Sequence, residues 1–285
     1  MKHKILAYTV QHTGTWFLIR LLHTAEVSSY WDISDGEVRK RGRPDPENLY
    51  EYNHFVALDD KVLSIAETFP VEEVDDDWLS NVFSQYMTEQ ERLNDLVVFN
   101  CHLKQPESNL VGALREKEPS FPIVSSMRDP LLAIQTLIWR QYKSYSTFTR
   151  ADEEAYHKFG RAHIHLWRIE NILDLPREKV FVFPVDTEID KNKLVTDLFS
   201  FCGLETTERT AKYIEEWKPQ NNTSSWEELH PDDDIRPFED FKQAVAAKDK
   251  TTVRKMLPIA FDYLHSRDDI KRKLEDLGYN NLVWF

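Results

Sequence analysis

ILAYTVQHTGTWFL, residues 5–18, is the stretch that decides the fold. It begins apolar, passes through a short polar loop with one glycine, and turns apolar again at helical spacing. This order predicts a buried strand over Lys4–Val10, a tight loop around Gly14 and a helix over Thr15–Val27. The backbone N–H groups at the start of such a helix point at the space above the loop, which suits a phosphate or sulfate group.

The side chains of this loop fit an anion as well. Gly14 lets the backbone approach closely, Thr13 and Thr15 carry hydroxyl donors, and His12 supplies a positive charge when it is protonated. The alternative is a plain strand-to-helix connection in which Thr13 or Thr15 caps the helix. The loop departs from G-x-x-x-x-G-K-[ST], so the sequence disfavours a magnesium-dependent nucleoside triphosphatase.

Further along the chain, strand and helix patterns alternate. Short apolar runs rich in β-branched or aromatic residues predict strands over Leu96–Asn100, Phe121–Met127 and Lys179–Pro184. Apolar residues at helical spacing predict helices over Asp77–Leu93, Pro130–Tyr145, Asp152–Leu173 and Asp190–Cys202, the last ending at Gly203. This alternation predicts an α/β fold with a central parallel sheet flanked by helices.

The remaining regions define the expected organisation. Ser28–Pro70 and Lys218–Pro237 lack clear periodicity, which predicts irregular loops of the kind that often carry substrate contacts. From Phe238 the pattern is helical almost to the end. We expect a single domain over residues 1–285, with an α/β core at 1–205 and a mostly helical C-terminal region at 206–285.

Composition restricts the possible partners. Asp and Glu number 49 against 36 Lys and Arg, and the resulting net charge of −13 disfavours nucleic acid, anionic membranes and polyanionic acceptors. Two cysteines, Cys101 and Cys202, form no disulfide framework, which favours a reducing, cytoplasmic compartment. No apolar run reaches about 18 residues, so we expect no membrane span. The opening MKHK leads into a strand rather than a secretory signal.

A second segment repeats the strand-turn-helix order of the first. IVSSMRDPLLAIQT, residues 123–136, places Arg128 at the carboxyl end of a strand, where ligands of open α/β sheets bind. Thr136 follows eight residues later, about two turns into the helix. Alternatively, Arg128 and Asp129 form a structural ion pair at the turn, and Thr136 is an ordinary helix residue.

Together, the two segments resemble the sulfotransferase family that uses 3′-phosphoadenosine 5′-phosphosulfate. The resemblance implies a P-loop-like fold with a nucleotide-binding core, in which HTGTWFL binds the 5′-phosphosulfate, while Arg128 and Thr136 bind the 3′-phosphate. VVFNCHLK, residues 97–104, is similar to the family's strand that ends in a histidine and a leucine. Residues 179–205 resemble its strand with an acidic residue and the following helix that ends in Phe-x-Gly-Leu.

The resemblance also implies catalytic roles. His102 is the candidate general base, because an imidazole pKa near 6.5 suits proton removal at neutral pH. His12 stands where the family has a lysine and would donate to the leaving phosphate, and Lys104 would offset charge near the acceptor. Trp16 either stacks on the purine or packs in the core, and the core is favoured. No metal is expected.

The sequence departs from the family at three places. The first loop has no lysine, Asn100 replaces the lysine two residues before the histidine, and the late glycine-rich loop with a lysine has no counterpart. NNTSSW, residues 221–226, is a candidate replacement for that loop through Trp226. These departures concern the chemistry of the leaving group more than the fold.

The acceptor is not readable from the chain, and neither is the oligomeric state. We expect a small or medium-sized acceptor in a pocket to which Tyr52, His54 and Phe55 contribute. Two other functions stay open: a P-loop-type small-molecule or nucleotide kinase, and a non-catalytic nucleotide-binding protein on the same scaffold.

Overall fold

The structure, a computed structural model of the chain, describes residues 3–10, 13–25, 28–34, 37–41, 55–57, 96–102, 122–141, 161–187, 189–215 and 236–285. The strands are β1 (His3–Thr9), β2 (Ser28–Ser34), β3 (Glu37–Arg41), β4 (Phe55–Ala57), β5 (Leu96–His102), β6 (Ile123–Met127) and β7 (Val180–Pro184). The helices are α1 (Thr15–His23), α5 (Pro130–Gln141), α7 (Arg161–Asp174), α8 (Lys191–Cys202), α9 (Glu208–Glu215), α11 (Arg236–Ala246), α12 (Lys250–Met256), α13 (Pro258–His265) and α14 (Asp268–Glu275).

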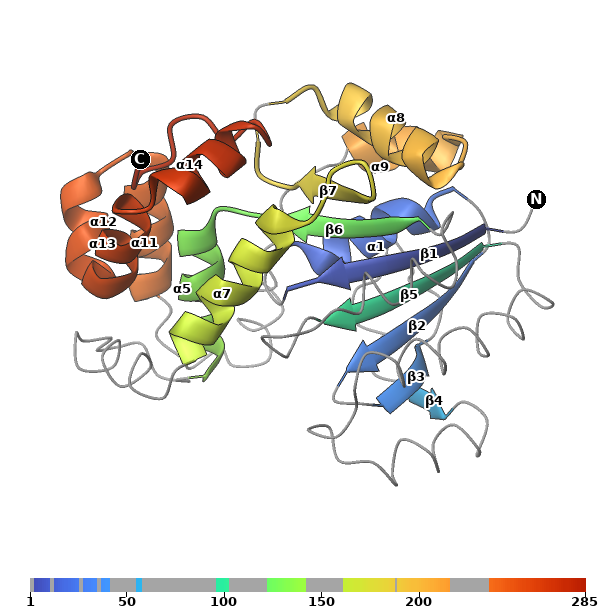
Figure 1. Cartoon of the computed structure of the whole chain (residues 1–285), viewed down its shortest axis with the longest axis horizontal. Coiled ribbons are helices and arrows are strands. Elements are labelled where there is room, and N and C mark those ends of the chain that lie inside the picture. Colours follow the sequence, from blue (N-terminus) through green and yellow to red (C-terminus); the bar gives the residue numbers. More distant parts are fainter. Residues whose placement is uncertain are drawn as a thin grey trace.

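The strands form one sheet in the order β4-β3-β2-β5-β1-β6-β7 (Figure 1). β2, β5, β1, β6 and β7 are mutually parallel neighbours, which confirms the expected α/β class and the expected central parallel sheet. All four strands predicted from apolar runs are present, and the one predicted over Leu96–Asn100 continues to His102. β1 lies in the interior of the sheet, between β5 and β6.

The prediction of irregular structure over Ser28–Pro70 is wrong for β2, β3 and β4. β3 runs antiparallel to β2, with Ser34 opposite Glu37, and β4 runs antiparallel to β3. Asp35 and Gly36 separate the paired residues in sequence, and Asp-Gly is typical of two-residue hairpin turns. The polar stretches SSYWDIS and EVRKR lack the apolar run by which the other strands were recognised.

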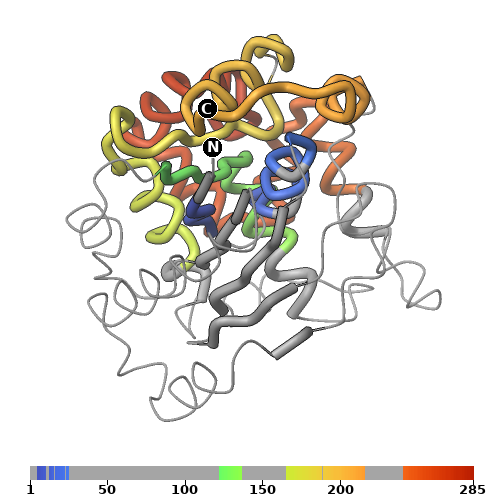
Figure 2. Tube along the Cα trace, turned by 90° about the vertical axis from the view of Figure 1, so that its right-hand side faces the viewer, coloured from blue at the N-terminus to red at the C-terminus, as the bar shows by residue number. Residues whose placement is uncertain are grey.

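Helices cover both faces of the sheet, and β1 contributes to both cores by alternation. Leu6, Tyr8 and Val10 pack in a cluster with side chains of α5, α7 and the C-terminal helices. Ile5 and Ala7 point to the other face and pack with α1 and α8. In Figure 2, α1, in blue, and α7, in yellow, lie on opposite sides of β1.

Local caps set the ends of the helices that flank the sheet. Asp190 caps α8 by accepting from the backbone N–H groups of Asn192 at 2.9 Å and Lys193 at 3.3 Å. Gly203 ends α8 in the left-handed conformation, with φ 67°, as its position in the sequence predicts. α1 ends at His23, before the expected Val27, because the Thr24 hydroxyl donates back to the carbonyl of Leu21 at 2.6 Å.

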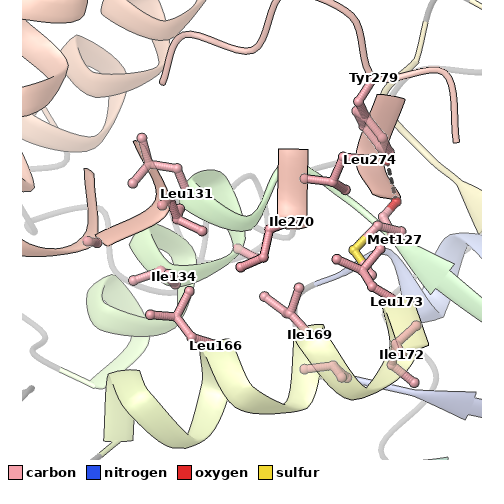
Figure 3. Close-up of a cluster of buried hydrophobic side chains, with 14 of the residues drawn as sticks. Met127, Leu131, Ile134, Leu166, Ile169, Ile172, Leu173, Ile270, Leu274 and Tyr279 are labelled. Atoms are coloured by element: carbon pink, nitrogen blue, oxygen red, sulfur yellow. Dashed lines mark hydrogen bonds between the residues drawn. The ribbon is translucent and has the colours of Figure 1, made fainter. Parts of the chain in front are cut away.

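The C-terminal helices complete the core on the α5 and α7 face. Side chains from β6, α5, α7 and α14 converge in one buried cluster, shown in Figure 3, to which Met127, Leu131, Ile134, Leu166, Ile169, Ile270 and Leu274 belong. The helical pattern expected from Phe238 is confirmed through α14, after which residues 276–285 leave the helix. The helix expected over Asp77–Leu93 lies outside the described residues, and so does most of Lys218–Pro237.

Within the described part of the chain, no helix has both the length and the apolar character needed to cross a bilayer.

Candidate functional site

The candidate site lies at the edge of the sheet where the parallel strands end. β5, β1, β6 and β7 are consecutive neighbours, and the register places His102 opposite Thr9 and Ala7 opposite Val124. Because the carboxyl ends of parallel strands share one edge, the loop after β1 and the turn after β6 leave the sheet there together.

Gly14 adopts a backbone conformation that favours glycine. Its φ of 99° lies in the left-handed region, and a Cβ added there would overlap the side chain of Val185. Val185 follows β7, so this close approach joins the first loop to the end of another strand. The local packing therefore selects glycine for both its backbone conformation and its small size.

The hydroxyls of the loop threonines face inward. Thr13 and Thr15 both donate to the carbonyl of Val10, at 2.7 Å and 3.2 Å, and both side chains are buried. The Thr13 hydroxyl also lies 3.2 Å from the Ser126 hydroxyl on β6. Their role as anion donors stays a prediction, and it requires these hydroxyls to turn away from Val10.

The start of α1 offers backbone donors instead. Leu18 makes the first bond of the helix, to the Gly14 carbonyl at 3.1 Å, so the amides of residues 15–17 precede the helical ladder. No side chain of the described residues caps this end, and the first turn carries no acidic residue. An anion placed here would meet the partial positive charge of the helix start.

The second turn is fixed by Asp129. Its Oδ1 accepts from the backbone N–H of Leu131 at 2.9 Å, and its carbonyl accepts from the N–H of Ala133 at 3.0 Å. Pro130 occupies the first position of α5, where its missing N–H costs nothing. The Nε1–H of Trp284 donates to the same Oδ1 at 2.9 Å.

Asp129 is fully buried, and its surroundings act on its charge in both directions. Burial raises the pKa of Asp129 above its usual value, while the donors on Trp284 and Leu131 oppose this by stabilising the carboxylate. The charge of Arg128 acts in the same direction as those donors, though more weakly.

Arg128 pairs with an acid other than its chain neighbour. Its Nε donates to Oδ2 of Asp186 at 2.6 Å, and the two side chains are 14% and 16% exposed. The ion pair found at the turn is therefore Arg128–Asp186, while Asp129 caps the helix. Among the described residues, the buried Oδ1 of Asp186 has no hydrogen-bond partner.

Contacts between the two loops bring them side by side. The N–H of Val185 donates to the carbonyl of Met127 at 2.9 Å, one residue before Arg128, and the Val185 side chain packs on Gly14. Together with the Thr13–Ser126 contact, these contacts bring the Gly14 loop and the Arg128 turn to the same two residues after β7, Val185 and Asp186.

The other predicted site residues fall into three groups. The Thr136 hydroxyl donates to the carbonyl of Leu132 at 2.8 Å, within its own helix, and the side chain is buried. His102 and Trp16 are placed by their backbone alone, at the last position of β5 and in the first turn of α1. His12, Lys104, Tyr52 and His54 lie outside the described residues.

Phe55 lies away from this edge. It begins β4 opposite Arg41, and the register carries that row across the sheet to Ile5, four residues before Thr9. β3, β2 and β5 separate β4 from β1. Phe55 is thus about 13 Å short of the loop along the strand direction and about 19 Å from it across the strands, so the two do not form one contact site.

Asp186 is a site residue that sequence reasoning did not assign to Arg128. The signal was present, because Asp186 is the second residue after the strand VFVFP, which ends at the same edge as the strand before Arg128. In the part of the chain that the structure describes, no group of three or more His, Cys, Asp or Glu side chains could hold a metal ion.

Comparisons with known proteins give little more. No family model matches the chain, and no curated protein matches it. A crystal structure of mouse sulfotransferase SULT7A1 complexed with PAP is similar at 13% sequence identity and a TM-score of 0.40, over 76% of this chain. The similar region spans 64% of the length of that mouse chain. A likeness of this degree establishes neither a shared fold nor a shared activity.

Proposed function

We propose that the chain is a sulfotransferase that moves a sulfuryl group from 3′-phosphoadenosine 5′-phosphosulfate to a hydroxyl or amine of a small or medium-sized acceptor. One observation carries the proposal: the Gly14 loop and the Arg128 turn, each opening a helix, lie side by side at the carboxyl edge of the parallel sheet. A nucleotide with phosphates at both ends of its ribose needs two such sites close together.

Each end of the nucleotide has its own set of donors in this proposal. The first-turn amides of α1 hold the 5′-phosphosulfate, because they precede the helical ladder and the first turn of α1 carries no acidic residue. Arg128 holds the 3′-phosphate. Its Nε then exchanges Asp186 for a phosphate oxygen, a stronger acceptor that carries more charge.

In this proposal, the chemical step is assigned to two histidines. His102, at the end of the strand beside β1, takes the proton from the acceptor hydroxyl as its oxygen bonds to sulfur. The bond between sulfur and the bridging oxygen breaks, and the leaving group is 3′-phosphoadenosine 5′-phosphate. His12 and the amides of α1 stabilise the charge that develops on that leaving phosphate.

Two measurements test this function. We expect 3′-phosphoadenosine 5′-phosphate to raise the melting temperature of the protein more than ATP does. We then expect labelled sulfate to be transferred from the donor to at least one member of a panel of phenols, alcohols and amines. His102→Ala should lower the transfer rate by about 10²–10⁴-fold while nucleotide binding persists.

The alternatives give different results in the same measurements. Stabilisation by ATP with magnesium and none by the adenosine bisphosphate favours the kinase. Binding of the bisphosphate with no transfer to any acceptor, in the wild type and in His102→Ala alike, favours the non-catalytic protein.

A further inference from the structure

The segment after α14, residues 276–285, returns to the end of β6. Gly278 turns the chain with φ 85°, and its N–H donates to the carbonyl of Glu275 at 2.8 Å. The next N–H, of Tyr279, donates to the carbonyl of Leu274 at 2.9 Å, which closes the end of the helix. The turn sends the following residues toward the sheet edge that carries the candidate site.

Tyr279 hydrogen bonds to Met127, the residue before Arg128. Its ring is 2% exposed, and its hydroxyl donates to the carbonyl of Met127 at 2.6 Å, the bond drawn in Figure 3. One side chain thus holds the strand end that leads into Arg128.

Trp284 hydrogen bonds to Asp129, the residue after Arg128. Its ring is fully buried, and its Nε1–H donates to Oδ1 of Asp129 at 2.9 Å. The Trp284 carbonyl in turn accepts from Nδ1 of His265 on α13 at 2.6 Å, so a hydrogen bond to its backbone also holds the tryptophan in place.

The segment itself is anchored to a helix and a loop of the C-terminal region. Lys250 on α12 donates to the carbonyl of Phe285, and Lys248 donates to the carbonyl of Asn281 at 2.6 Å. These contacts restrict how far the segment can move, and any movement would be passed to the two residues that flank Arg128.

We propose that Tyr279 and Trp284 are positioning residues for the candidate anion site, because they hold the chain on both sides of Arg128 and so fix the backbone from which its guanidinium extends. This inference rests on the proposed function, since it assigns the held arginine to the 3′-phosphate. A preformed arginine loses less freedom on binding, so that more of the contact energy appears as affinity.

The test separates the two ends of the nucleotide. Tyr279→Phe removes only the hydroxyl, and Trp284→Phe removes the N–H while keeping an aromatic ring. We expect each variant to bind 3′-phosphoadenosine 5′-phosphate about three- to tenfold more weakly, the effect of one lost hydrogen bond. Binding of adenosine 5′-phosphate, which lacks the 3′-phosphate, should not change, because the Gly14 loop is untouched.

Tyr263→Phe is the matched control. It removes a tyrosine hydroxyl from the same C-terminal region, where the hydroxyl donates to Glu170 at 2.7 Å and does not touch the Arg128 turn. We expect this variant to bind both nucleotides as the wild type does. Circular dichroism and melting temperatures establish that the variants are folded. If Trp284→Phe does not fold, Tyr279→Phe, which loses a single oxygen, decides the question.

A double-mutant comparison completes the design. In an Arg128→Gln background, Tyr279→Phe should cause no further loss of affinity for the bisphosphate. Equal losses for both nucleotides, no loss for either, or a full loss that persists without Arg128 would overturn the positioning role alone. A wild type that does not bind the bisphosphate would overturn the proposed function, and the positioning role with it.

Discussion

Gly14 packs against Val185 in a left-handed conformation, and both features make it hard to replace. We predict that Gly14→Ala lowers the free energy of unfolding by about 1–2 kcal/mol from backbone strain, with an added cost from the overlap with Val185. We also predict that it abolishes nucleotide binding, because the loop must move to admit the methyl group. Urea unfolding and calorimetric titration with 3′-phosphoadenosine 5′-phosphate measure the two effects.

Gly203→Ala is the control for this variant. Gly203 also has a positive φ, of 67°, but it ends α8, away from both loops. It should lose a similar strain energy and keep its nucleotide affinity. If the Gly14→Ala protein binds the nucleotide as tightly as the wild type does, the Gly14 loop is not part of the anion site.

Asp186 competes with any anion for Arg128. We predict that Asp186→Asn tightens binding of the adenosine bisphosphate by about three- to tenfold, because the variant removes a negative charge at 2.6 Å from the Arg128 Nε. The buried Oδ1 has no hydrogen-bond partner among the described residues, so none of them competes with Arg128 for that oxygen. Affinities measured at two salt concentrations test the prediction.

Asp197→Asn provides the comparison for charge alone. Asp197 is half exposed and pairs with Lys193 on the same helix at 3.0 Å. Its replacement should leave nucleotide affinity unchanged. Weaker binding by Asp186→Asn would mean that the acid orients Arg128 rather than competing for it.

Some site residues could be predicted from the sequence because a strand marks their position. Gly14 and Arg128 were recognised because each follows an apolar strand, and both lie at the expected edge. The ion pair of Arg128 with Asp186 was not predicted, because adjacency in sequence suggests Asp129 as the alternative partner, whereas Asp129 caps the helix. The direction of the Thr13 and Thr15 hydroxyls depends on the Val10 carbonyl, which the sequence does not reveal.

At the scale of the element, α8 offers a direct test of capping. We predict that Asp190→Ala lowers the free energy of unfolding by about 1 kcal/mol, because two backbone N–H groups lose their acceptor. Asp197→Ala, which breaks an exposed ion pair on the same helix, should cost less, about 0.3–0.5 kcal/mol. Urea midpoints with unchanged slopes measure both, and equal losses would contradict the role of the cap.

Elements with a strong apolar signal were predicted well, and polar ones were not. β1, β6 and β7 are buried in the sheet and read as apolar runs. β2 and β3 are polar, and only the Asp35–Gly36 pair between them marks a hairpin. Helix ends were predicted where a local cap decides them, as at Gly203, and missed where a side chain folds back, as at Thr24.

For the whole molecule, one buried histidine makes stability depend on pH. Burial lowers the pKa of His165 from its ordinary 6.5 to about 3, and the charge of Arg168 acts in the same direction. Because the folded value lies below the unfolded one, the stability that this group contributes is present above pH 6.5 and is lost as the pH falls. Between pH 7.5 and pH 5 we predict a loss of about 2 kcal/mol from this residue.

His165→Gln isolates this effect. Asp129, whose raised pKa acts with the opposite sign because its stability is lost as pH rises, is present in both proteins. The difference between their pH slopes, from urea unfolding at pH 7.5 and pH 5, therefore belongs to His165. The same slope in both proteins would show that His165 binds protons equally in the folded and unfolded states, so that folding does not lower its pKa.

The assembly of the site was predictable in outline only. The order of strand, loop and helix correctly indicated that two loops share one edge, because parallel strands end together. The contribution of Tyr279 and Trp284 was not predictable, since they lie 152 and 155 positions along the chain from the residues they hold. Contacts over such separations depend on how the C-terminal helices pack, and no local pattern encodes them.

The position of β1 in the interior of the sheet affects how the chain folds during its synthesis. Its neighbour β5 begins at Leu96, 87 positions after β1 ends at Thr9. At ribosomal speeds of about 5–20 residues per second, this apolar segment waits about 4–17 seconds for that partner. Over that interval it is a natural substrate for the chaperones that shield nascent chains, and slower elongation ahead of residue 96 would prolong its need for them.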